Sequence, residues 1–211
     1  MTTQNAKQDL IILVADKDME QTVTGVCLRP EALNVRGFTW QVLVHPGRDP
    51  GCLREGVDFL RPFQRQFAHA LILFDRIGCG RETRSRTELE ADIERMLSAS
   101  GWGAHRAAVV LDPELEVWIW SDSPHVERVL GWQGRQPPLR QWLQDQRYLA
   151  PGALKPSQPK EAMEEALRIA RLPRSSALYR QLAQQVSLSR CTDASFLKFK
   201  ATLQNWVLSL I

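Results

Sequence analysis

The stretch LIILVADKDMEQTV, residues 10–23, decides the fold class of this 211-residue chain. Its first six residues, 10–15, form an apolar run without polar alternation, which is typical of a strand buried on both faces of a parallel sheet. Three acids follow within five residues: Asp16, Asp18 and Glu20. Acids at the carboxyl end of a strand can be metal ligands, helix-capping groups or solvated surface, and all three interpretations are open at this point.

Three further apolar runs of the same kind follow along the chain. They lie at Trp40–Val44, 70–74 and 107–111. Residues 85–100 predict a helix, since Ser85 and Glu88 have capping-box spacing. Residues 52–67 have helical spacing up to Pro62, which should end or kink that helix. Strands that alternate with helices predict an α/β fold with a mostly parallel four-stranded sheet flanked by helices.

After residue 150 the composition changes. The stretch 151–162, PGALKPSQPKEA, is rich in proline and glycine and predicts a linker that leads into a helix. Helical patterns follow at 160–171, at 176–187 and from 195 to the end. The last has an apolar stripe that runs to Leu210. We therefore predict an α/β domain over 1–150 and a helical C-terminal extension over 151–211 that packs on it.

Composition argues against several classes of protein. A hydrophobic share of 44% and a charged share of 24% argue against a disordered chain. No apolar run approaches the roughly 18 residues needed to cross a bilayer, and the N-terminal MTTQNAKQ lacks the apolar centre of a secretory signal. The four cysteines form no CxxC pair, which supports neither a zinc site nor a disulfide framework. We expect a cytoplasmic protein without membrane contact.

The charges are unevenly distributed along the chain. Residues 1–150 contain 18 Lys and Arg against 20 Asp and Glu, whereas residues 151–211 contain 9 against 4. A basic C-terminal part suits an acidic partner such as nucleic acid, and it equally suits an ordinary solvated surface.

Acids follow three of the four predicted strands. They are Asp16 and Glu20 after the first, Asp75 at the end of the third, and Asp112, Glu114 and Glu116 after the fourth. The carboxyl ends of parallel strands meet at one edge of a sheet, where crowded carboxylates repel one another unless a cation lies among them. Oxygen ligands of this kind favour magnesium or manganese. As structural alternatives, Asp112 before Pro113 predicts a helix N-cap, and Asp18 suits the first turn of a helix.

Three motifs of the chain point to a known fold. They are ADKDME at 15–20, FD at 74–75 and PELEVWIWSD at 113–122. Together they resemble the Toprim fold of topoisomerases, primases and overcoming-lysogenization-defect nucleases. The chain is most similar to the small stand-alone Toprim-like proteins of unknown function in bacterial phage-defence operons, of the methylation-associated type. That family has a VEGxTE-like first motif and a third motif that resembles PEIEAWLLAD.

The resemblance implies magnesium- or manganese-dependent phosphodiester chemistry on nucleic acid. It assigns Asp16, Glu20 and Asp75 to catalysis, with Asp16 as the general acid or base. The metal would be held by Asp75, Glu20 and Glu116. The implied phosphate contacts are Lys17, Arg76, Arg81, Arg84 and Arg86. The implied partners are nucleic acid and other subunits of a defence system, and a homo-oligomer is left open.

The chain departs from the family pattern at three positions. The first acid is Asp16, where the family has glutamate, so its carboxyl lies about one methylene, roughly 1.5 Å, nearer the backbone. Toprim domains usually bind magnesium through Asp-x-Asp, but here Ile77 stands two residues after Asp75, so one metal carboxylate is missing. Lys17 replaces the glycine that usually follows the first acid, and its ammonium group could neutralise the acids without a metal. A catalytically degenerate subunit that serves as a recognition or assembly platform is therefore the main alternative to a nuclease. A toxin-like RNase of a two-gene module is a third hypothesis.

Overall fold

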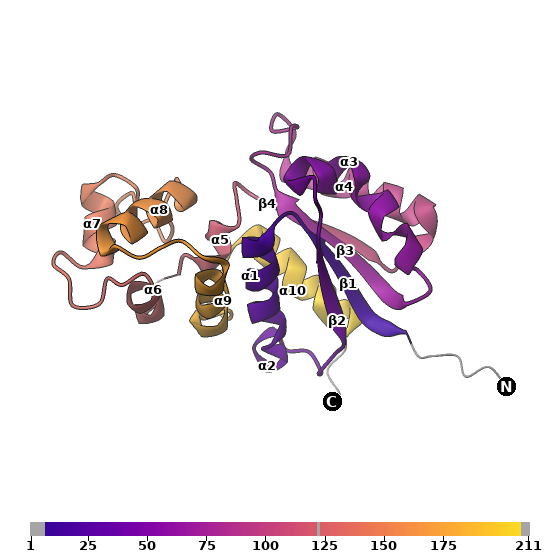
Figure 1. Ribbon diagram of the computed structural model, residues 1–211, viewed down its shortest axis with the longest axis horizontal. Helices are drawn as coiled ribbons and strands as arrows, with labels where there is room; N and C mark the ends of the chain where they lie inside the picture. The colour runs from indigo at the N-terminus through magenta and orange to yellow at the C-terminus, as the bar shows by residue number, and fades with distance from the viewer. Residues whose placement is uncertain (1–6, 122, 208–211) are drawn as a thin grey trace.

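The computed structural model describes residues 7–121 and 123–207 and confirms the predicted parallel sheet. Its four strands are β1 (Gln8–Val14), β2 (Trp40–Val44), β3 (Phe67–Asp75) and β4 (Arg106–Leu111). They lie in the order β2-β1-β3-β4, and every neighbouring pair is parallel (Figure 1). Residues 10–14 and 70–74 are fully buried, which explains why their sequences are apolar without alternation.

Helices cover both faces of the sheet. They are α1 (Lys17–Cys27), α3 (Arg48–Leu60), α4 (Arg86–Leu97) and α10 (Ala194–Trp206), while α9 (Ser176–Gln185) packs on α1. On one face, α3 packs on β1 and β3 while α4 packs on β4; on the other, α1 contacts β2 and α10 contacts β4 (Figure 1). Helix α9 lies along α1, where Gly25 permits close approach, because a Cβ there would lie 2.8 Å from Ala183 Cβ.

The remaining elements complete the described part of the chain. They are α2 (Pro30–Leu33), a 3₁₀ turn (Arg61–Phe63), a π turn (Ser98–Trp102), α5 (Glu116–Ile119), α6 (Pro124–Val129), α7 (Leu139–Asp145) and α8 (Pro159–Ala170). Helices α6, α7 and α8 form a group beside the sheet-containing part (Figure 1). In the two described ranges, every helix is too short or too polar to span a bilayer.

Several predicted helices are confirmed, with shifted ends. The Ser85–Glu88 capping box is present and α4 begins directly after Ser85. The helix predicted over 52–67 begins earlier, at Arg48, and changes to the 3₁₀ turn at the residues around Pro62. Helices α8, α9 and α10 match the three C-terminal patterns, while the prediction for Leu210 lies outside the described residues.

The predicted helix N-cap at Asp112 is wrong. No described helix begins at Pro113, and the next one, α5, begins at Glu116. Asp112 instead accepts a hydrogen bond of 2.7 Å from Arg76 Nε, so its carboxylate serves an ion pair between the loops that follow β3 and β4.

Two tryptophans of the third motif attach the C-terminal helices. Trp118 Nε1 donates to Ser195 Oγ at 2.7 Å, and its ring meets Phe196 edge-on with centroids 5.3 Å apart. Trp120 Nε1 donates to the carbonyl of Pro159 at 2.8 Å. The C-terminal helices therefore pack against the preceding part of the chain, while the division between residues 150 and 151 stays a prediction.

Candidate functional site

Acids from all four strand ends gather at the carboxyl edge of the sheet. Asp16 follows β1, Asp49 lies in the first turn of α3 after β2, and Asp75 ends β3. Glu114 and Glu116 follow β4. The main-chain N–H of Asp75 donates to Asp49 Oδ1 at 2.8 Å, which ties two of these strand ends together.

Asp75 is the acid whose surroundings are least favourable to charge. Its Oδ1 is buried and has no hydrogen-bond partner in the described part of the chain. Burial raises the pKa of Asp75 well above its usual range, and the negative charges of Asp49 and Glu116, followed by Asp16 and Glu114, raise it further. A buried carboxylate without a partner is costly, so this group favours the binding of a proton or a cation.

Asp49 shares this environment. Burial raises its pKa, as does the charge of Asp16, whereas the hydrogen bond from the Asp75 N–H lowers it. Sequence reasoning missed Asp49, although the rule that located the other acids applies to it. Asp49 lies five residues after the end of β2 and follows the segment HPGR, so the sequence does not mark it as an acid at the end of a strand.

Glu116 is buried and held by a tyrosine and an arginine. Tyr179 Oη donates to Glu116 Oε1 at 2.6 Å, and Arg174 Nη2 lies 3.6 Å from the same oxygen. Arg174 also donates to Tyr179 Oη at 2.9 Å and to Asp18 Oδ2 at 2.9 Å. Burial raises the pKa of both Glu116 and Tyr179. Arg174 Nη1 also donates to Glu164 Oε1 at 2.8 Å, so this arginine supplies positive charge to three acids at once.

A second cation reaches the acids from α8. Lys160 Nζ lies 3.4 Å from Glu114 Oε2. Burial lowers the pKa of Lys160, but the charges of Glu114 and Glu116 outweigh it and the net shift is upward. Neither Lys160, Arg174 nor Tyr179 was predicted, and the basic excess of 151–211 was the one sequence signal for the two cations.

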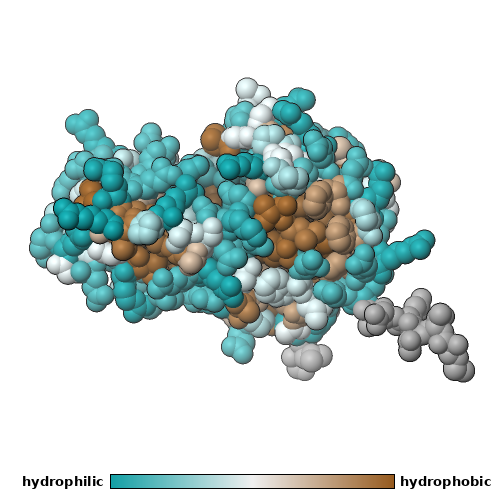
Figure 2. Space-filling view, viewed as in Figure 1, coloured by the Kyte–Doolittle hydropathy of each residue, from teal (hydrophilic) through white to brown (hydrophobic). Residues whose placement is uncertain are grey.

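A cleft of about 500 Å³ opens beside these acids. Its charged lining consists of Asp16, Lys17, Asp18, Arg48, Lys160 and Arg174. The surface over α1 and α9 is hydrophilic in Figure 2, between two apolar areas over β2 and over the α6–α8 group. Four of the charged lining side chains are basic and two are acidic. Lys17, Lys160 and Arg174 are paired with acids, so Arg48 is the basic side chain of the lining that has no ion pair among the described residues.

Two residues after β2 shape one wall of this cleft. The His45 ring is buried and its Nδ1 accepts a hydrogen bond of 3.0 Å from the Gly47 N–H. Arg48 has a φ of 52°, in the left-handed region that costs a non-glycine residue about 1 kcal/mol or more. A strained residue that lines a cleft is a candidate for a binding role.

The predicted metal ligands are only partly brought together. Asp75 and Glu116 belong to the acid group, but Glu20 is bound by Lys17, whose Nζ lies 2.7 Å from its Oε2. Within residues 7–121 and 123–207, no three His, Cys, Asp or Glu side chains are arranged to hold a metal ion. As the side chains stand, the set therefore does not fit a metal, and magnesium or manganese binding stays a prediction.

The predicted phosphate-binding arginines are mostly engaged within the protein. Arg76 donates to Asp112 and to the Glu82 carbonyl, each at 2.7 Å. Arg86 binds both carboxylate oxygens of Glu90, at 2.7 and 2.9 Å. Arg84 pairs with Asp92, and Arg81 is exposed. Of the predicted phosphate contacts, Lys17 is the one that lines the cleft; its side chain is 71% exposed.

Asp16 also has a structural role at the start of α1, and two substitutions at this position can test it. Its carboxylate accepts the Met19 N–H at 2.9 Å as the N-cap of α1. Asp16→Ala should lower the free energy of unfolding by about 1 kcal/mol, and Asp16→Ser should restore most of it. Urea denaturation measures both. If Asp16→Ser matched Asp16→Ala in stability, the capping role would be contradicted.

The site is thus a cleft with basic side chains beside a group of buried and partly buried acids, built from the strand ends, α8 and the loop before α9. Comparison with known proteins gives the chain no family, because no family model, curated protein or solved structure matches it.

Proposed function

We propose that the protein is a recognition subunit that binds the phosphate backbone of nucleic acid in the carboxyl-edge cleft. The observation that carries this proposal is Arg48, which lines the cleft at a positive φ and has no ion pair among the described residues; Lys17, Lys160 and Arg174, each paired with an acid, line the same cavity. Lysine and arginine side chains bind phosphate through charge-assisted hydrogen bonds. This is the platform alternative to which the missing second metal acid, replaced by Ile77, also points.

Internal cations favour recognition over metal chemistry. Glu116 and Asp18 share Arg174, Glu114 has Lys160, and Glu20 has Lys17. These pairs supply much of the positive charge that a metal would otherwise provide.

The biological setting of the proposal comes from the Toprim resemblance. It suggests a cytoplasmic bacterial anti-phage system with other protein subunits as partners. Deleting the gene from its native operon should then lower resistance to phage, as measured by plating efficiency. Unchanged plating would argue against the defence setting and leave the cleft proposal to be judged by binding.

Arg48→Gly tests phosphate binding while sparing the fold. Glycine adopts a positive φ without strain, so the variant should keep its stability within about 1 kcal/mol. Loss of one phosphate contact should weaken binding to all sequences alike and reduce the salt slope by about 1. Fluorescence anisotropy with labelled single-stranded DNA, duplex DNA and RNA over a salt series gives both quantities.

Arg147→Gly is the matched control for this substitution. Arg147 also has a positive φ, of 63°, but it lies in the turn after α7, away from the cleft lining. It should therefore bind like the wild type. Equal affinity and salt slope for wild type and Arg48→Gly, or an equal loss in Arg147→Gly, would contradict phosphate binding in the cleft.

The second candidate is a magnesium-dependent nuclease. The specific observation in its favour is Asp75 Oδ1, a buried carboxylate oxygen that lacks a partner in the described ranges. The test incubates the protein with plasmid, single-stranded DNA and RNA in magnesium or manganese, beside Asp75→Asn. Cleavage that disappears in the variant supports the nuclease. Absence of cleavage by the wild type, or equal cleavage by both proteins, counts against it.

A further inference from the structure

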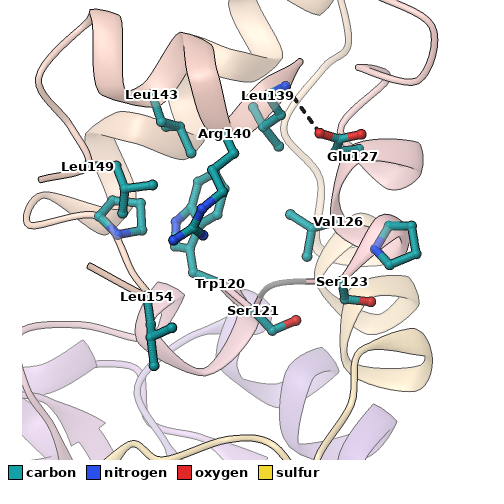
Figure 3. Close-up of a pocket in the computed structure, with 12 residues that line it drawn as sticks. Trp120, Ser121, Ser123, Val126, Glu127, Leu139, Arg140, Leu143, Leu149 and Leu154 are labelled. Carbon is teal, nitrogen blue, oxygen red and sulfur yellow. Dashed lines mark hydrogen bonds between the residues drawn. The ribbon is translucent and has the colours of Figure 1, made fainter. Parts of the chain in front are cut away.

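A second cavity, unrelated to the carboxyl-edge cleft, lies between α6, α7 and the chain after α5. Its volume is about 280 Å³. Most of its lining is apolar, with Trp120, Val126, Leu139, Leu143, Leu149 and Leu154 facing it (Figure 3). At about 30 Å³ for each water-sized group, it has room for roughly nine non-hydrogen atoms of a ligand.

One cationic side chain enters this apolar cavity. Arg140 extends from α7 toward Trp120 in Figure 3, and its Nη2 donates to the Ala153 carbonyl. Its Nε and Nη1 have no hydrogen-bond partner among the described residues. A guanidinium with free donors beside leucine side chains favours an anionic group, because charge-assisted hydrogen bonds strengthen as water is excluded.

Ser121, in the chain after α5, adds a buried hydroxyl to the residues that line the cavity. Ser121 Oγ is buried and has no hydrogen-bond partner in the described ranges. Native proteins usually satisfy such groups, so an unsatisfied one on a cavity wall points to a bound molecule. Among the described residues the lining has one acid, Glu127, whose Oε1 accepts the Leu139 N–H at 3.1 Å (Figure 3).

An adjoining cavity extends the same chemistry. It measures about 260 Å³ and shares Trp120, Ser121 and Leu154 with the first. Its further lining includes two more basic side chains, Lys155 and Arg190. Both cavities therefore combine apolar walls with positive charge around the Ser121 hydroxyl.

We propose that this cavity binds a small apolar carboxylic acid, with its hydrocarbon body against the leucines and its carboxylate on Arg140 and Ser121. Octanoate, with ten non-hydrogen atoms, is a suitable probe for a cavity of this size. The proposal does not depend on nucleic-acid binding, since no charged residue of the cleft lines this cavity.

The test titrates the full chain with octanoate, 1-octanol and octylammonium by calorimetry. Octanoate should bind at least about tenfold more tightly than the other two probes, because they lack the anion. Arg140→Met keeps the apolar stem and removes the charge, so it should abolish this preference. Arg65→Met, at an exposed arginine in the turn before β3, is the matched control and should retain it.

A second variant, at the mouth of the cavity, keeps the test decisive if Arg140→Met does not fold. Leu154 is 60% exposed and lines both cavities, so Leu154→Trp can fill the opening without overpacking the core. It should weaken octanoate binding by about tenfold or more at an unchanged melting temperature. Any of four results would overturn the proposal. They are equal binding of the three probes, no octanoate binding, a preference for octanoate that survives Arg140→Met, and full octanoate binding by folded Leu154→Trp.

Discussion

Gly51→Ala is expected to lower the free energy of unfolding by about 2 to 3 kcal/mol. Alanine is the better helix former by about 1 kcal/mol, so propensity alone predicts a gain in α3. Packing outweighs it, because a Cβ at position 51 would lie 2.1 Å from His45 Nδ1 and 2.5 Å from His45 Cε1. The ring cannot move aside easily, since it is 3% exposed and packs on Phe59 with centroids 5.0 Å apart.

Chemical denaturation of four variants tests this explanation: Gly51→Ala, His45→Ala, their double variant and a control. Gly37→Ala is the control, because a Cβ at Gly37 meets nothing within 4 Å, and its effect should stay within about 0.5 kcal/mol. The double variant Gly51→Ala/His45→Ala removes the clashing ring and should recover about 1 to 2 kcal/mol relative to additivity. If the two substitutions were strictly additive, the clash would not be the cause of the loss.

The same contact positions the cleft. His45 and Arg48 line it, and Asp49 follows in the first turn of α3. Because Gly51 lets the start of α3 approach the His45 ring, Gly51→Ala should also weaken nucleic-acid binding. Close packing against the His45 ring thus explains why a glycine stands inside α3, which helix propensity alone does not explain.

The sheet and its acidic edge were predictable because they depend on short-range patterns. Residues 10–14 and 70–74 are buried on both faces, which requires continuous apolar runs. Parallel pairing then places Asp16 and Asp75 at the same edge without further information. Asp49 obeys the same rule, but its distance from β2 concealed it.

The cations were not predictable, because their positions depend on long-range packing. Arg174 lies 156 residues from Asp18, with which it pairs, and it reaches that acid because α9 packs on α1. No local pattern encodes this contact. By contrast, the pair between Arg86 and Glu90 has i,i+4 spacing on one helix, so its engagement was readable from the sequence.

Asp75→Asn is expected to stabilise the protein at slightly alkaline pH, by on the order of 2 kcal/mol. The pKa of Asp75 in the folded protein is well above its usual value, through burial and the neighbouring acids. The folded state therefore retains a proton that the unfolded chain releases near pH 4, and stability falls as the pH rises from there through the folded pKa. Asparagine keeps the shape, carries no charge and can donate to a neighbouring carboxylate.

Denaturation at several pH values from about 5 to about 8 measures this effect. The stability difference between Asp75→Asn and the wild type should grow as the pH rises. Asp58→Asn, at a carboxylate that is 72% exposed and paired with Arg61, should show no such growth. A destabilised Asp75→Asn at every pH would contradict the electrostatic account.

The effect of magnesium on the stability of the wild type and of Asp75→Asn distinguishes the nuclease from the recognition subunit. If a cation binds at Asp75, magnesium should raise the melting temperature of the wild type at slightly alkaline pH and leave Asp75→Asn unchanged, since a ligand stabilises only the state that binds it. If no cation binds at Asp75, magnesium should leave both proteins unchanged. The carboxylate would then lower stability without a metal to offset it, and this result would favour the recognition proposal over the nuclease.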